Sequence, residues 1–241
     1  MKEIVIISLS LFSIIFSTQG FAKGGFSLGV FGSLATDGGV IEDTIRDKEF
    51  SYAPEVEIES DEIIIPGGGL FIRYDFSNNL FIRTGFEYNE LVYGGKVSSR
   101  DESNSIYSEY EMQYKSYASP LFFGINTTPD KGKTNIYGAL GIVMAQVEIR
   151  QEYVNTLGGN KHEYRSDSDN STIGFGGIIG IEKRIMQGSY IIIEYSFYSC
   201  EINRSEEGQY TMDGNPQADY EFVERYGLPR QQIRLGLRYA F

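Results

Sequence analysis

Residues 231–241 alternate strictly between apolar side chains and polar or small ones. The apolar residues occupy the odd positions: Ile233, Leu235, Leu237, Tyr239 and Phe241. A period of two residues is typical of a β-strand with one apolar face, because successive side chains of a strand point to opposite sides. That face has to pack against a protein core or a lipid bilayer, and the rest of the sequence has to decide between the two.

The same alternation recurs in seven earlier segments, so the sequence predicts eight strands. They cover residues 25–34, 64–76, 80–88, 112–125, 134–147, 173–182, 190–199 and 231–241. The connections between them alternate along the chain between long polar segments and short turns, beginning with a long one. This order predicts a single all-β domain, an eight-stranded antiparallel up-and-down β-barrel made of hairpins.

The fourth predicted strand contains an irregular feature, Pro120. Proline cannot donate a backbone hydrogen bond to a neighbouring strand. The apolar positions also change parity around it, from Met112 and Tyr114 to Leu121, Phe123 and Ile125. We therefore expect a β-bulge or a local kink at Pro120.

Two kinds of barrel fit this alternation. A soluble, lipocalin-like barrel has an apolar interior, whereas an outer-membrane barrel turns its apolar face to lipid. Outer-membrane barrels have short periplasmic turns and long extracellular loops, as the connections here alternate. The polar face mixes charged residues with glycine, which suits a narrow, filled lumen. Four aromatic residues at the short-turn ends fit an interfacial girdle: Tyr74, Phe76, Tyr239 and Phe241. The pattern favours transmembrane β-strands.

The first 22 residues have the pattern of a cleaved signal peptide. Lys2 precedes an apolar run at residues 4–16, and small residues stand at Gly20 and Ala22, where a signal peptidase would cut. The run is shorter than the roughly 20 residues that a membrane-spanning helix needs. We expect residues 1–22 to be removed on export and residues 23–241 to form the barrel domain in a bacterial outer membrane.

Composition removes some functions. A net charge of −12 argues against nucleic-acid binding, which requires clustered Lys and Arg. The single cysteine, Cys200, excludes an intramolecular disulfide, and we expect it to be a buried free thiol. Most of the 33 acidic residues fall in the four long segments, which predicts acidic extracellular loops.

The predicted inward face carries a set of charged residues. An eight-stranded barrel is just wide enough for side chains to fill it, so these charges are expected to pair as a plug rather than to line an open channel. We expect Glu194 to pair with Arg238 or Arg234, with Glu182 joining the network. The alternative is a set of separate, solvated charges in a wet lumen. The full set is Arg73, Arg83, Glu87, Glu182, Glu194, Arg234 and Arg238.

The export signal, the eight strands and the final segment IRLGLRYAF (233–241) resemble the small OmpA/OmpX-like outer-membrane β-barrel family. The segment YASPLFFG (117–124) is similar to a middle strand of such barrels. The resemblance covers essentially all of residues 23–241. It implies that the partners include outer-membrane lipid and the barrel-assembly machinery, which in this family reads an alternating C-terminal strand that ends in Phe. That role would fall to Tyr239 and Phe241.

Other chemistry has weaker signals, and we expect neither a cofactor nor a metal. The one histidine, His162, lies near Ser166, Asp167 and Ser168 in a hydrophilic segment, without the scaffold that a catalytic triad needs. Residues 167–170 begin like a calcium loop but lack the later Gly and Glu. Five acids could gather calcium weakly: Glu55, Glu57, Glu59, Asp61 and Glu62.

Tyrosines punctuate the long segments, and aromatic residues on loops often recognise partners. They are Tyr107, Tyr110, Tyr153, Tyr164, Tyr210 and Tyr220. The sequence therefore predicts a non-enzymatic cell-surface protein that serves envelope integrity, or adhesion and host contact through its loops. The alternatives are a lipid- or peptide-hydrolysing enzyme with its site at the outer rim, and a narrow, porin-like ion channel.

Overall fold

The computed structural model describes residues 25–37, 64–76, 79–100, 105–126, 134–157, 160–212 and 215–241. Within these ranges the regular elements are strands, and no helix is long and apolar enough to cross a membrane. The predicted signal peptide lies outside the described residues. The strands are β1 (Gly25–Asp37), β2 (Ile65–Asp75), β3 (Leu80–Arg100), β4 (Ser105–Asn126), β5 (Thr134–Leu157), β6 (Asn160–Met186), β7 (Ser189–Ser199), β8 (Glu201–Met212), β9 (Asn215–Gly227) and β10 (Gln231–Ala240).

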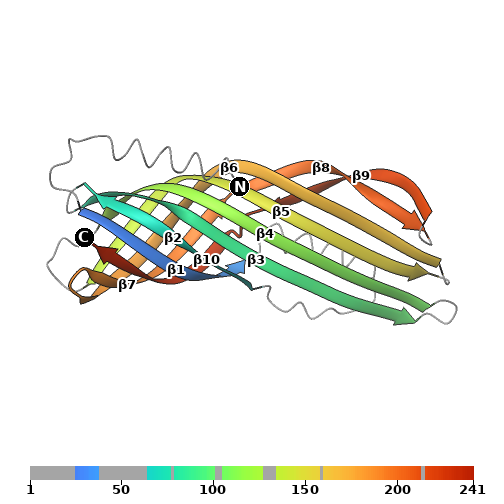
Figure 1. The fold of residues 1–241 in the computed structure, drawn as a ribbon, viewed down its shortest axis with the longest axis horizontal. Helices are drawn as coiled ribbons and strands as arrows, with labels where there is room; N and C mark the ends of the chain where they lie inside the picture. Colours follow the sequence, from blue (N-terminus) through green and yellow to red (C-terminus); the bar gives the residue numbers. More distant parts are fainter. Residues whose placement is uncertain are drawn as a thin grey trace.

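Eight of these strands close into a barrel (Figure 1). The order around it is β5-β4-β3-β2-β1-β10-β7-β6, and a β5–β6 pairing completes the ring. Every pairing is antiparallel, and β1 pairs with β10 from Ser27↔Ala240 onward. The predicted eight-stranded antiparallel barrel is therefore confirmed.

All four long segments were predicted as loops, and for the three that the structure describes the prediction was wrong. Strands β3 to β6 continue through residues 90–100, 105–111, 148–157 and 160–170, so these strands contain 21, 22, 24 and 27 residues. The fourth long segment forms the β8–β9 hairpin, and β8 continues the wall beside β6 at residues 162–165. The first long segment lies outside the described residues.

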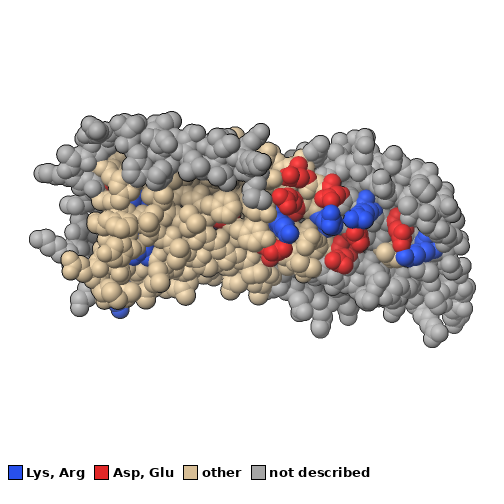
Figure 2. Space-filling model, viewed as in Figure 1, with Lys and Arg blue, Asp and Glu red and all other residues tan. Residues whose placement is uncertain are grey.

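We call residues 90–100, 105–111, 148–157 and 160–170 of these strands, together with the β8–β9 hairpin, the extension. It remains in strand form because its two faces have different partners. On the inner face Met112, Tyr114, Val147 and Ile149 are buried. On the outer face oppositely charged residues stand on neighbouring strands, as in the pair of Arg150 with Asp167 at 3.0 Å. Figure 2 shows large red and blue patches gathered over one half of the molecule, beside a half that is mostly tan, with only small charged patches. Cross-strand pairs of this kind stabilise a sheet, so a polar segment can still form a strand, and polar composition alone is not a reliable sign of a loop.

The structure contradicts the β-bulge expected at Pro120, since no register shift occurs there. The pairing of β4 with β3 is interrupted between Thr84↔Leu121 and Glu87↔Ala118 but resumes in the same register. On its other side Pro120 lies opposite Val143 in an unbroken ladder. The change of parity has another cause: the even positions of β4 from Met112 to Gly124 are all buried on the inward face, and the upper part of the lumen is apolar.

The lumen is filled by aromatic rings that lie over inward-facing glycines. A Cβ atom at Gly29 would lie 2.2 Å from the Phe71 ring, and one at Gly124 would lie 2.2 Å from the Phe81 ring. Each ring occupies the space that a larger side chain on the neighbouring strand would need. The glycines noted on the polar face therefore make room for aromatic packing across the barrel.

An apolar cluster closes the lumen at the end that bears the extension. The Tyr114 hydroxyl donates a 2.8 Å hydrogen bond to the Gly227 carbonyl, and Leu228 packs in the same cluster. Ile202, from the base of the β8–β9 hairpin, also belongs to it. Val143 and Val147 line this level from β5, and both are fully buried. The base of the hairpin thus covers the top of the barrel interior.

Candidate functional site

The middle of the lumen contains a buried arginine–glutamate–tyrosine group. Arg83, from β3, forms a two-pronged ion pair with Glu194, from β7: Nη1 contacts Oε1, and Nη2 lies 3.1 Å from Oε2. The Tyr137 hydroxyl, from β5, donates to the same Glu194 carboxylate. The Arg83 guanidinium also lies 3.6 Å from the centre of the Phe71 ring, a cation–π contact. These residues converge because inward positions of strands on different sides of a narrow barrel meet near its axis.

A second group of the same composition lies nearer the extension. Arg234, from β10, contacts Glu87 at 2.7 Å. The Tyr198 hydroxyl donates to both oxygens of Glu87, at 2.8 and 2.7 Å, and accepts a hydrogen bond from Arg234. Arg234 Nη1 also lies 3.9 Å from Glu194 Oε2, which connects the two groups. The carboxylates are therefore satisfied on several sides, as buried charges require.

A third group lies at the short-turn end of the lumen. Glu182 Oε1 accepts from Arg238 at 2.9 Å and from Asn135 at 3.1 Å, and Arg73 lies 3.7 Å from its other oxygen. Asp75 pairs with Arg73 at 2.7 Å and with Arg238 at 3.9 Å. In all, the lumen joins four arginines to four carboxylates, so the formal charges of this set cancel: Arg73, Arg83, Arg234 and Arg238 with Asp75, Glu87, Glu182 and Glu194.

All seven charged residues selected from the sequence lie inside the barrel and pair as expected for a plug. Glu182 joins the network and Glu194 reaches Arg234, as predicted, but the main partner of Glu194 was not predicted. Glu194 pairs mainly with Arg83, across the lumen, and only more distantly with Arg234. Arg238 pairs with Glu182 instead. Arg234 stands directly opposite Glu194 in the β7–β10 ladder, yet its guanidinium reaches Glu87. The sequence could indicate only pairs between neighbouring strands, whereas the shortest ion pairs of Glu194 and Arg234 in the structure cross the lumen.

Sequence reasoning missed several members of these groups. Tyr137 and Tyr198 hold the two central carboxylates, and Asp75 completes the third group. The alternation could have identified Tyr198 and Asp75, because both share the parity of charged residues on their strands. The contacts of Tyr137 needed the closed barrel to become visible.

Two sets of aromatic residues occupy outward-pointing strand positions, although Tyr74 itself is buried. At the short-turn end the rings of Tyr239 and Phe241 are 5.1 Å apart, and those of Phe26 and Tyr74 are 4.8 Å apart. Toward the extension the Tyr88 and Tyr117 rings are 5.3 Å apart.

On the extension side of the Tyr88–Tyr117 pair, the Tyr88 hydroxyl donates a 2.6 Å hydrogen bond to Glu90. This bond raises the pKa of Tyr88 to about 12 and lowers the pKa of the Glu90 carboxyl.

The other candidates are not assembled into sites. His162 lies on β6, opposite Asn155 and Met212 in the backbone ladders. On the same strand Asp167 is exposed and pairs with Arg150, whereas Ser168 is buried, so the two point to opposite sides. Among the described residues no group of three or more His, Cys, Asp and Glu side chains could hold a metal. Residues 55–62 lie outside the described ranges. All six tyrosines of the long segments lie on strands rather than on loops.

Solved structures with a similar fold are small outer-membrane proteins. OprG from Pseudomonas aeruginosa is 9% identical, with 91% of this chain and 96% of that chain covered and a TM-score of 0.48. The N-terminal β-barrel domain of Pseudomonas aeruginosa OprF is 9% identical, with 91% and 100% covered and a TM-score of 0.43. Ail, the attachment invasion locus protein of Yersinia pestis, is 13% identical, with 90% and 97% covered and a TM-score of 0.40.

No protein-family model matches the chain, and the search of curated proteins found no match. At these identities and TM-scores the similar structures carry no argument about activity.

Proposed function

We propose that this chain is an integral β-barrel protein of a bacterial outer membrane and that it acts at the cell surface without catalysing a reaction. One observation carries the membrane assignment: the barrel has its charges inside and its large apolar side chains outside. Arg234 is 0% exposed in the lumen, whereas Leu140 is 65% exposed on the outer wall. A soluble barrel has the opposite arrangement.

The length of the strands and the apolar character of their outward positions agree with this assignment. Strand β7 has 11 residues and β10 has 10, close to the 9–11 residues that a tilted transmembrane strand needs. On both strands the outward positions between the ends are apolar. A Lys or Arg facing lipid at the bilayer midplane costs about 2–4 kcal/mol, which explains why the outward positions in the middle of β7 and β10 carry no charge.

The filled lumen argues against a channel. The paired charges occupy its length, and the apolar cluster around Tyr114 and Leu228 covers one end. An ion would have to separate buried pairs and pass apolar side chains. We therefore expect no steady conductance in planar bilayers, and a stable, ohmic conductance would support the channel instead.

The extension supports a role at the surface. Strands β3 to β6 and the β8–β9 hairpin project beyond the apolar band on the side of the long connections, which in such barrels faces outward from the cell. A stiff, charged platform of this kind suits adhesion, host contact or stabilisation of the envelope. The partner would bind to the extension and not to the lumen.

The test of the membrane assignment is heat modifiability. Small membrane barrels resist detergent until heated, so protein from the outer-membrane fraction should migrate differently on a gel before and after boiling. An unchanged mobility, or recovery in a soluble fraction, would contradict the assignment.

A deletion variant separates the surface role from the fold. Replacing residues 203–225 by a short turn should leave heat modifiability unchanged while reducing adhesion or envelope resistance of the cells. If both cell properties were unaffected, the hairpin would have no part in the proposed role.

A further inference from the structure

Four buried side chains beside the second lumen group have polar atoms without a hydrogen-bond partner among the described residues. The atoms are Asn89 Oδ1, Ser196 Oγ, both amide atoms of Gln232, and Arg234 Nε and Nη1. Each of the four residues is at most 1% exposed. Buried polar groups of folded proteins are nearly always hydrogen-bonded, so a group of such atoms in one place indicates a further occupant. We call these four residues the Gln232 cluster.

The cluster lies at one level of the lumen. Gln232 is the inward residue next to Arg234 on β10, and Asn89 is the inward residue next to Glu87 on β3. Arg234 and Glu87 are already joined at 2.7 Å. Gln232 stands directly opposite Ser196 in the β7–β10 ladder, and the Cβ atoms of residues opposite one another are about 4.5–5.5 Å apart. The unpaired atoms of three strands therefore face a common space.

Small side chains around the cluster leave room in that space. The inward positions beside it are Ser33, Ala35, Gly67 and Ser116. Gly67 lies opposite Asn89, and a Cβ at Gly67 would lie 2.1 Å from Asn89 Oδ1 and 2.8 Å from Ser33 Oγ. Two oxygens thus converge above a residue that has no side chain.

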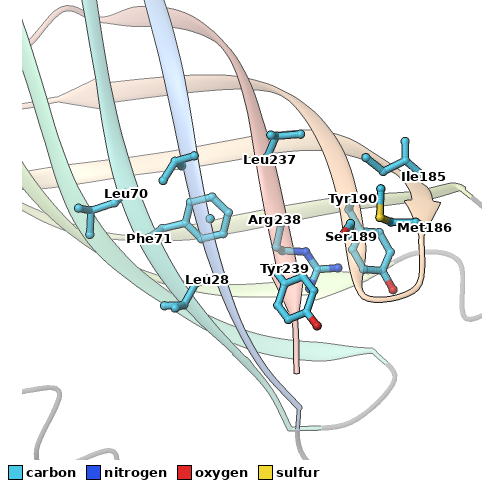
Figure 3. Close-up of a pocket in the computed structure, with 12 residues that line it drawn as sticks. Leu28, Leu70, Phe71, Ile185, Met186, Ser189, Tyr190, Leu237, Arg238 and Tyr239 are labelled. Atoms are coloured by element: carbon cyan, nitrogen blue, oxygen red, sulfur yellow. The ribbon is translucent and has the colours of Figure 1, made fainter.

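Apolar side chains separate the cluster from both ends of the barrel. Toward the extension Ala35 and Ile65 are fully buried members of the apolar cluster. Toward the short turns the Phe31 and Phe71 rings lie 6.4 Å apart. Figure 3, a close-up of an apolar groove in the outer wall near the short turns, shows the Phe71 ring against β1. An occupant of the cluster is therefore enclosed, and it has to be small.

The chemistry of the unpaired atoms selects the kind of occupant. Arg234 Nε and Nη1 and Gln232 Nε2 are donors, Asn89 Oδ1 and Gln232 Oε1 are acceptors, and the Ser196 hydroxyl can be either. The Arg234 charge is offset by Glu87. An anion would be repelled by that carboxylate and a cation by the guanidinium. A small neutral molecule that both donates and accepts hydrogen bonds is what remains, and water is the smallest of this class.

We propose that the Gln232 cluster is a closed binding site for about two water molecules, since a buried water makes about three hydrogen bonds and the unpaired atoms number six. The waters link Gln232 and Ser196 to Arg234 and Asn89, and so extend the hydrogen bonding of the second lumen group across β3, β7 and β10. The site belongs to the lumen and does not depend on the membrane location proposed above.

The experiment is solution NMR of the full barrel in phospholipid nanodiscs, with detection of cross-relaxation between water and individual N–H groups. The wild type should give water cross-peaks at the Gln232 side-chain amide and at Arg234 Nε–H. The Leu228 backbone N–H should give none, because it donates to the Cys200 carbonyl at 3.1 Å and Leu228 lies in the apolar cluster.

Two variants assign the bound water to the cluster. Gln232→Met keeps the length of the side chain but removes both amide atoms, so the cross-peak at Arg234 Nε–H should be lost. The matched control Gln231→Met makes the same change at the neighbouring exposed position and should keep that cross-peak. Folding of each sample is checked first by the dispersion of its backbone amide signals. If Gln232→Met does not fold, Ser196→Ala replaces it, with the same loss expected.

Three results would overturn the proposal. One is a wild type without a water cross-peak at either group, which would mean that the polar atoms pair with one another. Another is an equally strong cross-peak at the Leu228 N–H, which would mean a lumen open to solvent. The third is a folded Gln232→Met or Ser196→Ala variant that keeps the Arg234 cross-peak at the strength of the Gln231→Met control.

Discussion

The buried pair of Arg83 and Glu194 allows a quantitative test of the lumen. Replacing Arg83 with Met keeps an unbranched side chain of moderate size but leaves the Glu194 carboxylate without its closest cation. Removing one partner of a buried ion pair costs about 3–5 kcal/mol, because the remaining charge is uncompensated. Arg234 Nη1 lies 3.9 Å from Glu194 and the Tyr137 hydroxyl still donates to it, so we expect the lower end of that range, about 3 kcal/mol.

The reasoning predicts strong coupling between the two positions. In the double variant Arg83→Met/Glu194→Gln the uncompensated charge is gone, so part of the lost stability should return. A coupling energy of about 1–3 kcal/mol is expected for residues in direct contact. The exposed pair Arg150–Asp167 serves as a control: its side chains are 48% and 63% exposed, and Arg150→Met should cost less than about 1 kcal/mol.

Stability would be measured by urea-dependent unfolding in phospholipid vesicles, followed by loss of the folded band on an unheated gel. Two results would refute the argument. One is an Arg83→Met variant no less stable than the Arg150→Met control. The other is a double variant whose loss equals the sum of the two single losses, which would mean that the charges do not depend on one another.

Three further predictions concern single residues. A Gly124→Leu variant should lose about 1–3 kcal/mol of its free energy of unfolding, because the new Cβ would lie 2.2 Å from the Phe81 ring. The control Gly32→Leu, where nothing lies within 4 Å of the new Cβ, should keep its stability, and equal urea midpoints for the two variants would contradict the aromatic packing. Burial raises the pKa of the Cys200 thiol to about 11, so a maleimide at pH 8 should label the heated protein only, and fast labelling of the folded barrel would show an open path to this thiol. The pKa of Tyr88 is raised from 10.0 to about 12, so its contribution to stability is complete below pH 10 and is lost as the pH rises toward 12; the Tyr88→Phe variant should lack this alkaline loss, and identical pH profiles would exclude the hydrogen bond to Glu90.

Local alternation was sufficient to predict the barrel and the inward position of its charges. Every second residue of β10 points to the same side, and the sequence displays that directly. Alternation says nothing about which inward residues meet, since Arg83 and Glu194 are 111 positions apart in the chain. It also failed for Met112 and Tyr114, because their inward face is apolar above the charged groups. A change in the chemistry of the lumen looked like a bulge in the strand.

The ends of the long strands were missed for a related reason. The polar composition of residues 90–111 and 148–170 predicts loops, whereas in the structure these residues continue the ladders outward, with charged pairs on one face. The pattern of apolar and polar residues reflects what surrounds a strand. Where a strand leaves the bilayer, its outward residues change from apolar to polar, although the strand itself continues. The contacts at the base of the β8–β9 hairpin, such as Tyr114 with Gly227, depend on closure of the ring and have no local signal.

The pairing of β1 with β10 has a consequence for the order of events in assembly. The Phe241 backbone N–H donates to the Phe26 carbonyl at 2.9 Å, so the two ends of the described barrel meet at one rim. Until the final strand is in place, β1 and β7 each present a row of unmatched backbone groups, which hydrocarbon cannot solvate. A ribosome delivers that strand after the other strands of the ring, so the ring cannot be sealed before β10 has been synthesised. A permuted chain, with these ends fused and a new start opened at another short turn, should reach the same barrel by a different sequence of closures.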